Sequence, residues 1–247
     1  MKRFSWLSKT DPLPMTHHRL WLVIPAAGIG QRMQAECPKQ YLKLNGRFIL
    51  DITVSRLLEC AGFAGCMVAL NARDQWWSAT ESAADSRVHT CAGGQERADS
   101  VLAALGGLDG LAGENDWVLV HDAARPCLHK RDLVRLVDTL QDHPVGGLLA
   151  APVADTLKQS DGEKPPGVVS TVDRRGLWRA LTPQMFRFGV LRQALESSLA
   201  AGHGVTDESS AIEFSGKMPV LVEGRSDNIK ITVPSDLALA EFILSQL

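Results

Sequence analysis

The sequence has 247 residues, of which 45% are hydrophobic and 22% are charged, and its formal net charge is −2. This composition is typical of a globular α/β domain that can form a core without disulfides or a structural metal. A net charge near zero gives no reason to expect a nucleic acid or an anionic membrane as a partner. Any affinity for phosphate must therefore come from a local cluster of donors.

Five cysteines are scattered along the chain without the spacing of a zinc site or a redox motif: Cys37, Cys60, Cys66, Cys91 and Cys127. We expect reduced, buried thiols, as in a cytoplasmic protein. Residues 1–19 lack the continuous apolar stretch of a signal peptide, and no later run reaches the ~18 apolar residues of a membrane helix. The sequence predicts a cytoplasmic protein with a disordered tail over residues 1–19 and one domain over residues 20–247.

Short apolar runs alternate with segments of helical periodicity through the first part of the chain. Strands are predicted over residues 20–25, 65–70, 87–91, 117–120 and 147–153. Helices are predicted over residues 49–60, near 73–84, and over 95–108 and 130–140. This alternation predicts a single-domain α/β fold, with a mostly parallel, Rossmann-like sheet and helices on both faces.

Residues 154–176 interrupt the alternation. Two β-prone segments flank a turn rich in proline and glycine, which predicts a hairpin arm that projects from the sheet. Because an isolated hairpin is only marginally stable, we expect the arm to pack on another surface, such as a second subunit. At the end of the chain, residues 234–247 carry apolar side chains at helical spacing (Leu237, Ala240, Leu244 and Leu247) and predict an amphipathic helix that begins near Pro234.

The loop after the first strand reads P-A-A-G-I-G-Q-R-M over residues 25–33, and C-P-K-Q-Y follows over residues 37–41. Small residues at the carboxyl end of a strand let backbone N–H groups approach an anion. Met33 stands where a dinucleotide-binding fingerprint needs a small residue, and the G-K-[S/T] of a P-loop is missing. The loop does carry two cations, Arg32 and Lys39.

These two cations suit a nucleoside triphosphate, which carries about four negative charges. An opposite charge ~4 Å away contributes roughly 4 kcal/mol at an effective dielectric constant near 20. By spacing alone, a pair of solvated cations in a glycine-rich turn is an equally good interpretation. Other segments of the sequence must distinguish a triphosphate-binding loop from a pair of solvated cations.

Both loop segments resemble the signature of the 2-C-methyl-D-erythritol 4-phosphate cytidylyltransferase family. The resemblance extends from about residue 20 to residue 247 and continues in five ordered blocks: G-G-Q-E-R-A-D-S (93–100), H-D-A-A-R-P (121–126), L-T-P-Q (181–184), T-D-E (206–208) and N-I-K (228–230). It implies a nucleotidyltransferase (GT-A-like) sheet. It also implies transfer of a cytidylyl group from CTP to 2-C-methyl-D-erythritol 4-phosphate, which gives 4-diphosphocytidyl-2-C-methyl-D-erythritol and pyrophosphate in the non-mevalonate isoprenoid precursor pathway.

The resemblance further implies roles for individual residues. Four cations match catalytic positions of the family: Arg32, Lys39, Arg174 and Lys230. The nucleotide-binding positions are matched by Ala26, Ala27, Gly28, Gly94, Gln95, Arg97 and Ser100. Positions near the substrates are matched by Asp122, Arg125, Thr156, Thr182, Thr206 and Thr232. At Gln95 some relatives carry an acid, which matters little if the contacts there are made by the backbone.

Two acidic residues are candidates for holding Mg²⁺ or another divalent cation. Asp122 follows a buried strand, where an unpaired carboxylate is costly, and the resemblance places it beside the metal and the incoming substrate. Asp227 is the second metal candidate because it lies near Lys230 after another strand. Because Mg²⁺ also uses the phosphates of its substrate, one or two carboxylates are enough.

The resemblance also implies a homodimer. In the family the arm crosses to a second subunit, so Thr156 and Arg174 would complete the site of the partner. Three other functions remain open from the sequence: a ribitol- or other polyol-phosphate cytidylyltransferase, a nicotinamide-dependent oxidoreductase, and an inactive nucleotide-binding module. Met33 argues against the oxidoreductase, and the full set of cations argues against the inactive module.

Overall fold

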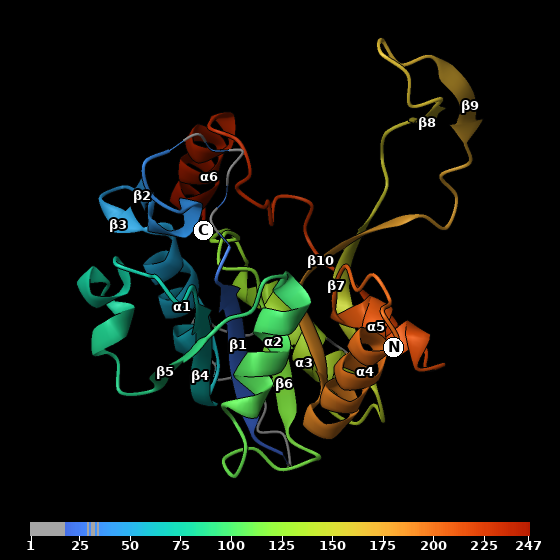
Figure 1. The fold of residues 1–247 in the computed structure, drawn as a ribbon. Coiled ribbons are helices and arrows are strands. Elements are labelled where there is room, and N and C mark those ends of the chain that lie inside the picture. Colours follow the sequence, from blue (N-terminus) through green and yellow to red (C-terminus); the bar gives the residue numbers. More distant parts are fainter. Residues whose placement is uncertain (1–17, 29, 31–32, 34) are drawn as a thin grey trace, which may run out of the picture.

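The computed structural model describes residues 18–28, 30, 33 and 35–247. Its centre is a seven-stranded sheet in the order β11-β7-β10-β6-β1-β4-β5 (Figure 1). The strands are β1 (Leu20–Ala26), β4 (Phe63–Leu70), β5 (Val88–Ala92), β6 (Trp117–Val120), β7 (Gly146–Pro152), β10 (Trp178–Arg187) and β11 (Val220–Glu223). Strand β10 is antiparallel to both of its neighbours, and the other strand pairs are parallel. The predicted mostly parallel sheet is confirmed.

Strand β1 occupies the middle of the sheet because it is apolar on both faces. Leu22 pairs in register with Cys66 of β4 and with Leu119 of β6, and all three side chains are fully buried. Neighbouring Val23 faces the opposite side and is fully buried as well. A continuous apolar run of this kind is typical of a parallel strand covered by helices on both sides.

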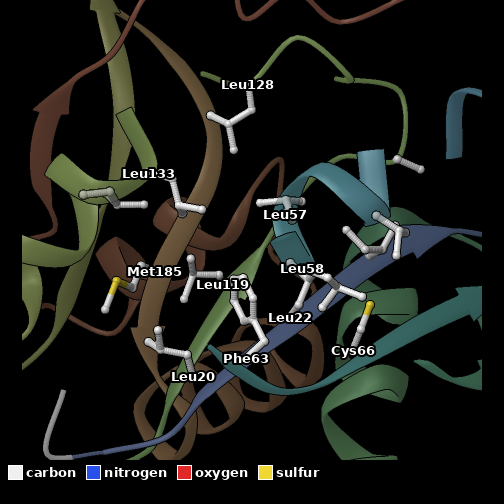
Figure 2. Packing of buried hydrophobic residues seen from close by; sticks show 14 of the residues in the cluster. Leu20, Leu22, Leu57, Leu58, Phe63, Cys66, Leu119, Leu128, Leu133 and Met185 are labelled. Carbon is white, nitrogen blue, oxygen red and sulfur yellow. The ribbon is translucent and has the colours of Figure 1, made fainter. Parts of the chain in front are cut away.

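Helices cover both faces, as the sequence predicts. On one face, α1 (Ile49–Cys60) and α3 (Lys130–Leu140) pack on the sheet, and Figure 2 shows Leu57, Leu58 and Leu133 around Leu22 and Leu119. The other face is covered by α2 (Arg97–Gly106), α4 (Phe188–Ala200) and α5 (Glu208–Phe214). The structure therefore has three layers, with the sheet between two helical layers.

The helix predicted near residues 73–84 is wrong. The segment instead forms two 3-10 turns, η3 (Trp77–Ala79) and η4 (Ser82–Ala84). The Asp74 carboxylate accepts hydrogen bonds from the backbone N–H groups of Trp76 and Trp77, at 3.0 and 2.8 Å. The Asp51 carboxylate of α1 accepts hydrogen bonds from the backbone N–H groups of residues 81 and 82, at 3.0 and 2.8 Å. These carboxylates bind the N–H groups that a continuous helix would pair with its own carbonyls.

The hairpin arm is present. Strands β8 (Leu157–Ser160) and β9 (Val168–Val172) form a separate antiparallel pair that stands away from the main sheet (Figure 1). Every residue of β9 is exposed in the single chain, including Val168 at 68%. The expected packing of the arm on a second subunit stays a prediction.

A third, smaller hydrophobic core is separate from the two cores on the faces of the sheet. It joins α6 (Ser235–Ser245) to the short strand β2 (Lys43–Leu44) and to α1. Strand β2 pairs with the equally short β3 (Arg47–Phe48). Ala240 and Ile243 are the buried residues of α6, whereas Leu237 and Leu244 are only partly buried. The predicted apolar stripe is therefore wrong at Leu247, which lies beyond the helix and is 38% exposed.

The predicted tail over residues 1–19 lies outside the described residues except for His18 and Arg19. Arg19 belongs to the folded domain, because its backbone N–H and its Nε atom both donate to the Asp116 carboxylate at 3.1 Å. Among the helices that the structure describes, each is too short or too polar to span a lipid bilayer.

Candidate functional site

A cavity of about 240 Å³ opens at the carboxyl ends of β1 and β6. Its described lining consists of residues 25–28, 39–40, 94–97, 100, 122–124 and 230. The loop after β1, the start of α2 and the loop after β6 therefore meet in one place. In parallel sheets this edge is where ligands bind.

Glycines allow these loops to approach closely. A Cβ atom at Gly93 would lie 2.5 Å from the Cβ of Ala27, and one at Gly94 would lie 2.2 Å from the Cβ of Asp99. Gly30 has a φ of +65°, and a Cβ there would lie 2.9 Å from Cγ of Lys39. By contrast, a Cβ at Gly28 would meet nothing within 4 Å, so this part of the loop borders open space. A ligand can approach the backbone at Gly28 closely.

Two side chains from η2 (Lys39–Tyr41) connect it to the loop after β1 and to the segment before α6. Gln40 is buried, and its Nε2 atom donates to the carbonyl oxygens of Ala26 and Gly28 at 2.7 and 3.1 Å. The Nζ atom of Lys39 donates to the carbonyl oxygen of Ile231 at 3.0 Å. Lys39 therefore lies between the loop after β1 and the segment before α6. Arg32, the other predicted cation of the loop, lies outside the described residues.

The start of α2 has its own internal hydrogen bonds. Glu96 and Asp99 form a reciprocal capping box, and the Ser100 hydroxyl accepts from the N–H of Gly94 at 3.1 Å while it donates to the carbonyl of Glu96 at 3.1 Å. Ser100 is 2% exposed. Its hydroxyl therefore holds the loop in shape, and the open part of this wall consists of Gln95, Arg97 and backbone atoms.

Asp122 is the electrostatic centre of the cavity. Its Oδ1 atom is 3.0 Å from Nε of Arg97, and its Oδ2 atom is 3.2 Å from Nε of Arg125 and 2.9 Å from Nζ of Lys230. Burial by itself would raise the pKa of Asp122, but the nearby charges of Arg97, Lys230 and Arg125 outweigh it and hold that pKa well below its usual range. Asp122 is therefore anionic near neutral pH.

Arg97 connects Asp122 to a second buried carboxylate. Its Nη1 and Nη2 atoms lie 2.6 and 3.1 Å from the two oxygens of Glu208, which is 1% exposed. Burial would lower the pKa of Arg97, and the charges of Glu208 and Asp122 more than reverse this. The sequence analysis includes Glu208 in the T-D-E block but gives it no role. An acidic residue at the start of a helix is the signal that could have identified Glu208, but this helix, α5, was not predicted.

A hydrogen-bonded chain lies behind Asp122. The Thr182 hydroxyl accepts from the backbone N–H of Asp122 at 3.1 Å and contacts Nδ1 of His121 at 3.1 Å. The Nε2 atom of His121 is 3.0 Å from the carbonyl oxygen of Arg125. Since a carbonyl only accepts, the hydrogen of neutral His121 lies on Nε2, and Nδ1 accepts from the Thr182 hydroxyl. Thr182, predicted near the substrate, supports the loop after β6 from inside the protein.

The chain matches the family model for IspD, 2-C-methyl-D-erythritol 4-phosphate cytidylyltransferase, over residues 20–246. It is 54% identical over 221 residues to the 2-C-methyl-D-erythritol 4-phosphate cytidylyltransferase of Ectopseudomonas mendocina, an alignment that covers 89% of this chain and 93% of the relative. The enzyme of that name from Hahella chejuensis is 49% identical over 235 residues, with 94% and 96% covered.

A solved structure is similar as well. The crystal structure of Francisella tularensis IspD is 37% identical, with a TM-score of 0.78, and the match covers 91% of this chain and 99% of that one. The chain belongs to the IspD family. The family assignment of the sequence analysis and its fold class are therefore confirmed.

The structure brings together ten of the residues that the sequence analysis matched to the IspD family. These ten line the cavity: Ala26, Ala27, Gly28, Lys39, Gly94, Gln95, Arg97, Ser100, Asp122 and Lys230. Arg125 joins them through Asp122, and its Nη1 atom donates to the carbonyl of Asn228 at 2.7 Å. Their place in one cavity is what the sequence predicts, while their individual roles stay predictions.

Six other predicted residues are not among the described residues that line this cavity, and Thr182, which supports the loop after β6, is one of them. Thr156 and Arg174 lie on the exposed arm, and Thr206 is exposed just before α5. The Thr232 hydroxyl donates to the carbonyl of Lys230 at 3.0 Å, so it supports that segment. Asp227 forms an ion pair with Arg225, two residues away, because both side chains lie on the same turn. Asp227 is thus paired with Arg225 and is not among the described residues that line the cavity, so its role as a second metal ligand stays a prediction.

The donor set of the cavity fits Mg²⁺ through one protein ligand. In the part of the chain that the structure describes, no group of three or more His, Cys, Asp or Glu side chains forms a metal site. Of the two acidic residues that line the cavity, Glu96 is engaged in the capping box of α2, which leaves Asp122. Mg²⁺ in phosphate-binding sites takes one or two carboxylates and completes its ligands with phosphates and water. Asp122 would be the one protein ligand, and the ion would share its oxygens with Arg97, Arg125 and Lys230.

Burial of His121 makes the stability of the protein depend on pH. Burial lowers the pKa of fully buried His121 to about 4, from 6.5. Between these pH values the unfolded chain binds a proton at this position and the folded protein does not, so stability is lost as the pH falls. From pH 7 to pH 5 we expect this residue to lower the free energy of unfolding by about 2 kcal/mol.

Urea unfolding of the wild type and of His121→Asn at both pH values measures the contribution of His121 to the pH dependence of the free energy of unfolding. The variant should lose about 2 kcal/mol less than the wild type between pH 7 and pH 5. His89→Asn, a substitution at an exposed position on β5, serves as the control and should behave as the wild type. An identical pH dependence in the wild type and His121→Asn would show that His121 is not held neutral by burial.

Proposed function

We propose that this protein transfers a cytidylyl group from CTP to 2-C-methyl-D-erythritol 4-phosphate, which gives 4-diphosphocytidyl-2-C-methyl-D-erythritol and pyrophosphate in the non-mevalonate isoprenoid pathway. The observation that carries the proposal is the cavity at the end of β1. There a glycine-lined backbone and the side chain of Lys39 line the same cavity as the buried Asp122 carboxylate, which pairs with Arg97 and Lys230, in a chain 54% identical to an enzyme of this name. The family match favours this acceptor over ribitol phosphate or another polyol phosphate.

The reaction requires that the charges of the phosphates are neutralised and that the two substrates are oriented. An oxygen of the acceptor phosphate attacks the α-phosphorus of CTP and forms the new P–O bond. The bond from that phosphorus to the bridging oxygen breaks, and pyrophosphate leaves with the electron pair. Because the attacking oxygen is already anionic, the reaction needs no strong general base. The protein contributes by holding two anionic phosphates in line, where they would otherwise repel each other.

The described cations are placed for this task. Lys39 is held against the carbonyl of Ile231 at one side of the cavity, and Lys230 is held against Asp122 at another. The open backbone at Gly28 leaves room for the phosphates between them. A Mg²⁺ ion bound with CTP would neutralise part of the triphosphate charge, and Asp122 would hold it.

The active protein in this proposal is a homodimer. In one chain Arg174 and Thr156 lie on the exposed arm, and neither lines the described part of the cavity. An apolar, exposed strand such as β9 gains stability when a second chain covers it. A cytoplasmic location is part of the proposal too, supported by five cysteines that form no disulfide.

A product assay tests the proposed reaction. Purified protein is mixed with CTP and Mg²⁺ and with either 2-C-methyl-D-erythritol 4-phosphate or ribitol 5-phosphate, and pyrophosphate release is followed. We expect rapid release with the methylerythritol phosphate, at least ~100-fold slower release with the ribitol phosphate, since a site that hydrogen-bonds one set of hydroxyls discriminates against another, and loss of release when EDTA removes the metal. Faster release with the ribitol phosphate would replace the acceptor assigned here.

Lys39→Ala should lower kcat far more than it weakens CTP binding. A preorganised donor aimed at developing charge is typically worth 10²–10³-fold in kcat, so we expect a loss of about that size with a KM for CTP changed less than ~5-fold. Lys43→Ala, at the exposed position of β2, is the matched control and should keep wild-type kcat. An unchanged kcat in Lys39→Ala would remove Lys39 from the reaction.

Mixing two inactive variants tests whether the arm completes the site of a partner. Lys39→Ala and Arg174→Ala are refolded together in equal amounts. If the arm crosses between subunits, half of the dimers are mixed and each contains one intact site, so about one quarter of wild-type activity returns. A mixture of Arg174→Ala with Thr156→Ala places both defects on the arm and should stay inactive. Recovery in neither mixture, or a monomer in solution, would contradict the shared site.

A further inference from the structure

Glu208 is held in place by its neighbours on both sides. Gln184 of β10 donates from Nε2 to the Asp207 carboxylate at 2.9 Å and accepts from the N–H of Ser209 at 2.8 Å. Asp207 also caps α5 by accepting from the N–H of Ser210 at 2.9 Å. Gln184 is 1% exposed, so it ties the start of α5 to the central sheet. The backbone of Glu208 therefore has a fixed position at the start of α5.

From that position Glu208 holds most of the Arg97 guanidinium. The two carboxylate oxygens of Glu208 accept from Nη1 and Nη2 of Arg97, and Asp122 accepts from its Nε. A planar guanidinium bound along two edges in this way has a fixed orientation. Arg97 lines the cavity, and its side chain is 26% exposed. A triphosphate in the cavity would therefore compete with Glu208 for this cation.

We propose that Glu208 is a positioning residue: it keeps the Arg97 guanidinium against Asp122 and prevents Arg97 from turning into the cavity to pair with the triphosphate. Asp122 then keeps its orientation toward Lys230 and toward the phosphates. This inference rests on the proposed function. It adds a residue that acts through Arg97 and does not touch the substrates.

Glu208→Gln keeps the size of the side chain and removes its charge. A released Arg97 adds positive charge at the cavity while Asp122 loses its fixed partner. We expect kcat to fall by about 10-fold or more, as for other residues that orient a group in direct contact with a ligand, while the KM for CTP does not rise. Arg97→Lys, which cannot bridge two carboxylates with one planar group, should show the same pattern.

A double-mutant cycle separates positioning from a general structural effect. In an Arg97→Ala background, Glu208→Gln should change kcat by less than ~2-fold, because its partner is already gone. Glu213→Gln is the control on the same helix, where the carboxylate accepts from the Ser209 hydroxyl at 2.6 Å, and it should keep wild-type kcat. Independent losses that multiply in the double variant, or an unchanged kcat in Glu208→Gln, would overturn the proposal.

A crystal structure of Glu208→Gln tests the inference separately from the proposed reaction. If the wild type forms no product from CTP and 2-C-methyl-D-erythritol 4-phosphate, the proposed function fails, but the position of Arg97 still decides the inference. Arg97 displaced from Asp122 supports it. Arg97 unmoved from Asp122 refutes it.

Discussion

The attraction between Asp122 and three cations is the interaction on which the cavity depends. Arg97, Arg125 and Lys230 come from α2, from the loop after β6 and from the segment before α6, and only the fold brings them together. One attraction at ~3 Å is worth roughly 5 kcal/mol at an effective dielectric constant near 20, while desolvation of a carboxylate costs several kcal/mol. The three attractions together oppose this cost and the cost of burying the Arg97 and Arg125 guanidinium groups. The carboxylate in turn reduces the repulsion among the cations.

Hydrogen bonds and ion pairs connect the five sequence blocks to this network. Arg97 of the G-G-Q-E-R-A-D-S block binds Asp122 of the H-D-A-A-R-P block and Glu208 of the T-D-E block. Gln184 of the L-T-P-Q block binds Asp207. In the N-I-K block, the Asn228 side chain donates to the carbonyl of Thr182 at 2.7 Å, and Lys230 binds Asp122. Blocks that are distant in sequence therefore form one continuous set of hydrogen bonds and ion pairs around the cavity.

The sequence predicts the elements whose signals are local. Helices α1 and α3 and strand β6 begin and end at the predicted residues because their apolar spacing is regular. The 73–84 segment was predicted wrongly because Asp51, more than twenty residues away, binds two of its N–H groups. Strands β10 and β11 and helices α4 and α5 were not predicted. For β10, the antiparallel pairing with both β6 and β7 depends on partners distant in the chain.

The site was predictable where small residues and cations follow a strand, as at Gly28 and Lys39. Three buried side chains were missed as supports of the site: Gln40, Gln184 and Glu208. Each acts through contacts with segments that lie far away in sequence, except Gln40, which binds the loop just before it. Conversely, Ser100 and Thr182 match nucleotide-binding and substrate positions of the family, and their hydroxyls form hydrogen bonds within the protein.

A crystal structure of Asp122→Asn tests most directly whether one negative charge organises the cavity. The substitution keeps the shape of the side chain and removes its charge. The account predicts that Arg97 stays on Glu208 but leaves residue 122, and that Lys230 turns toward solvent, while the backbone of β1 and β6 is unchanged. Three cations still gathered around the neutral amide would contradict the account.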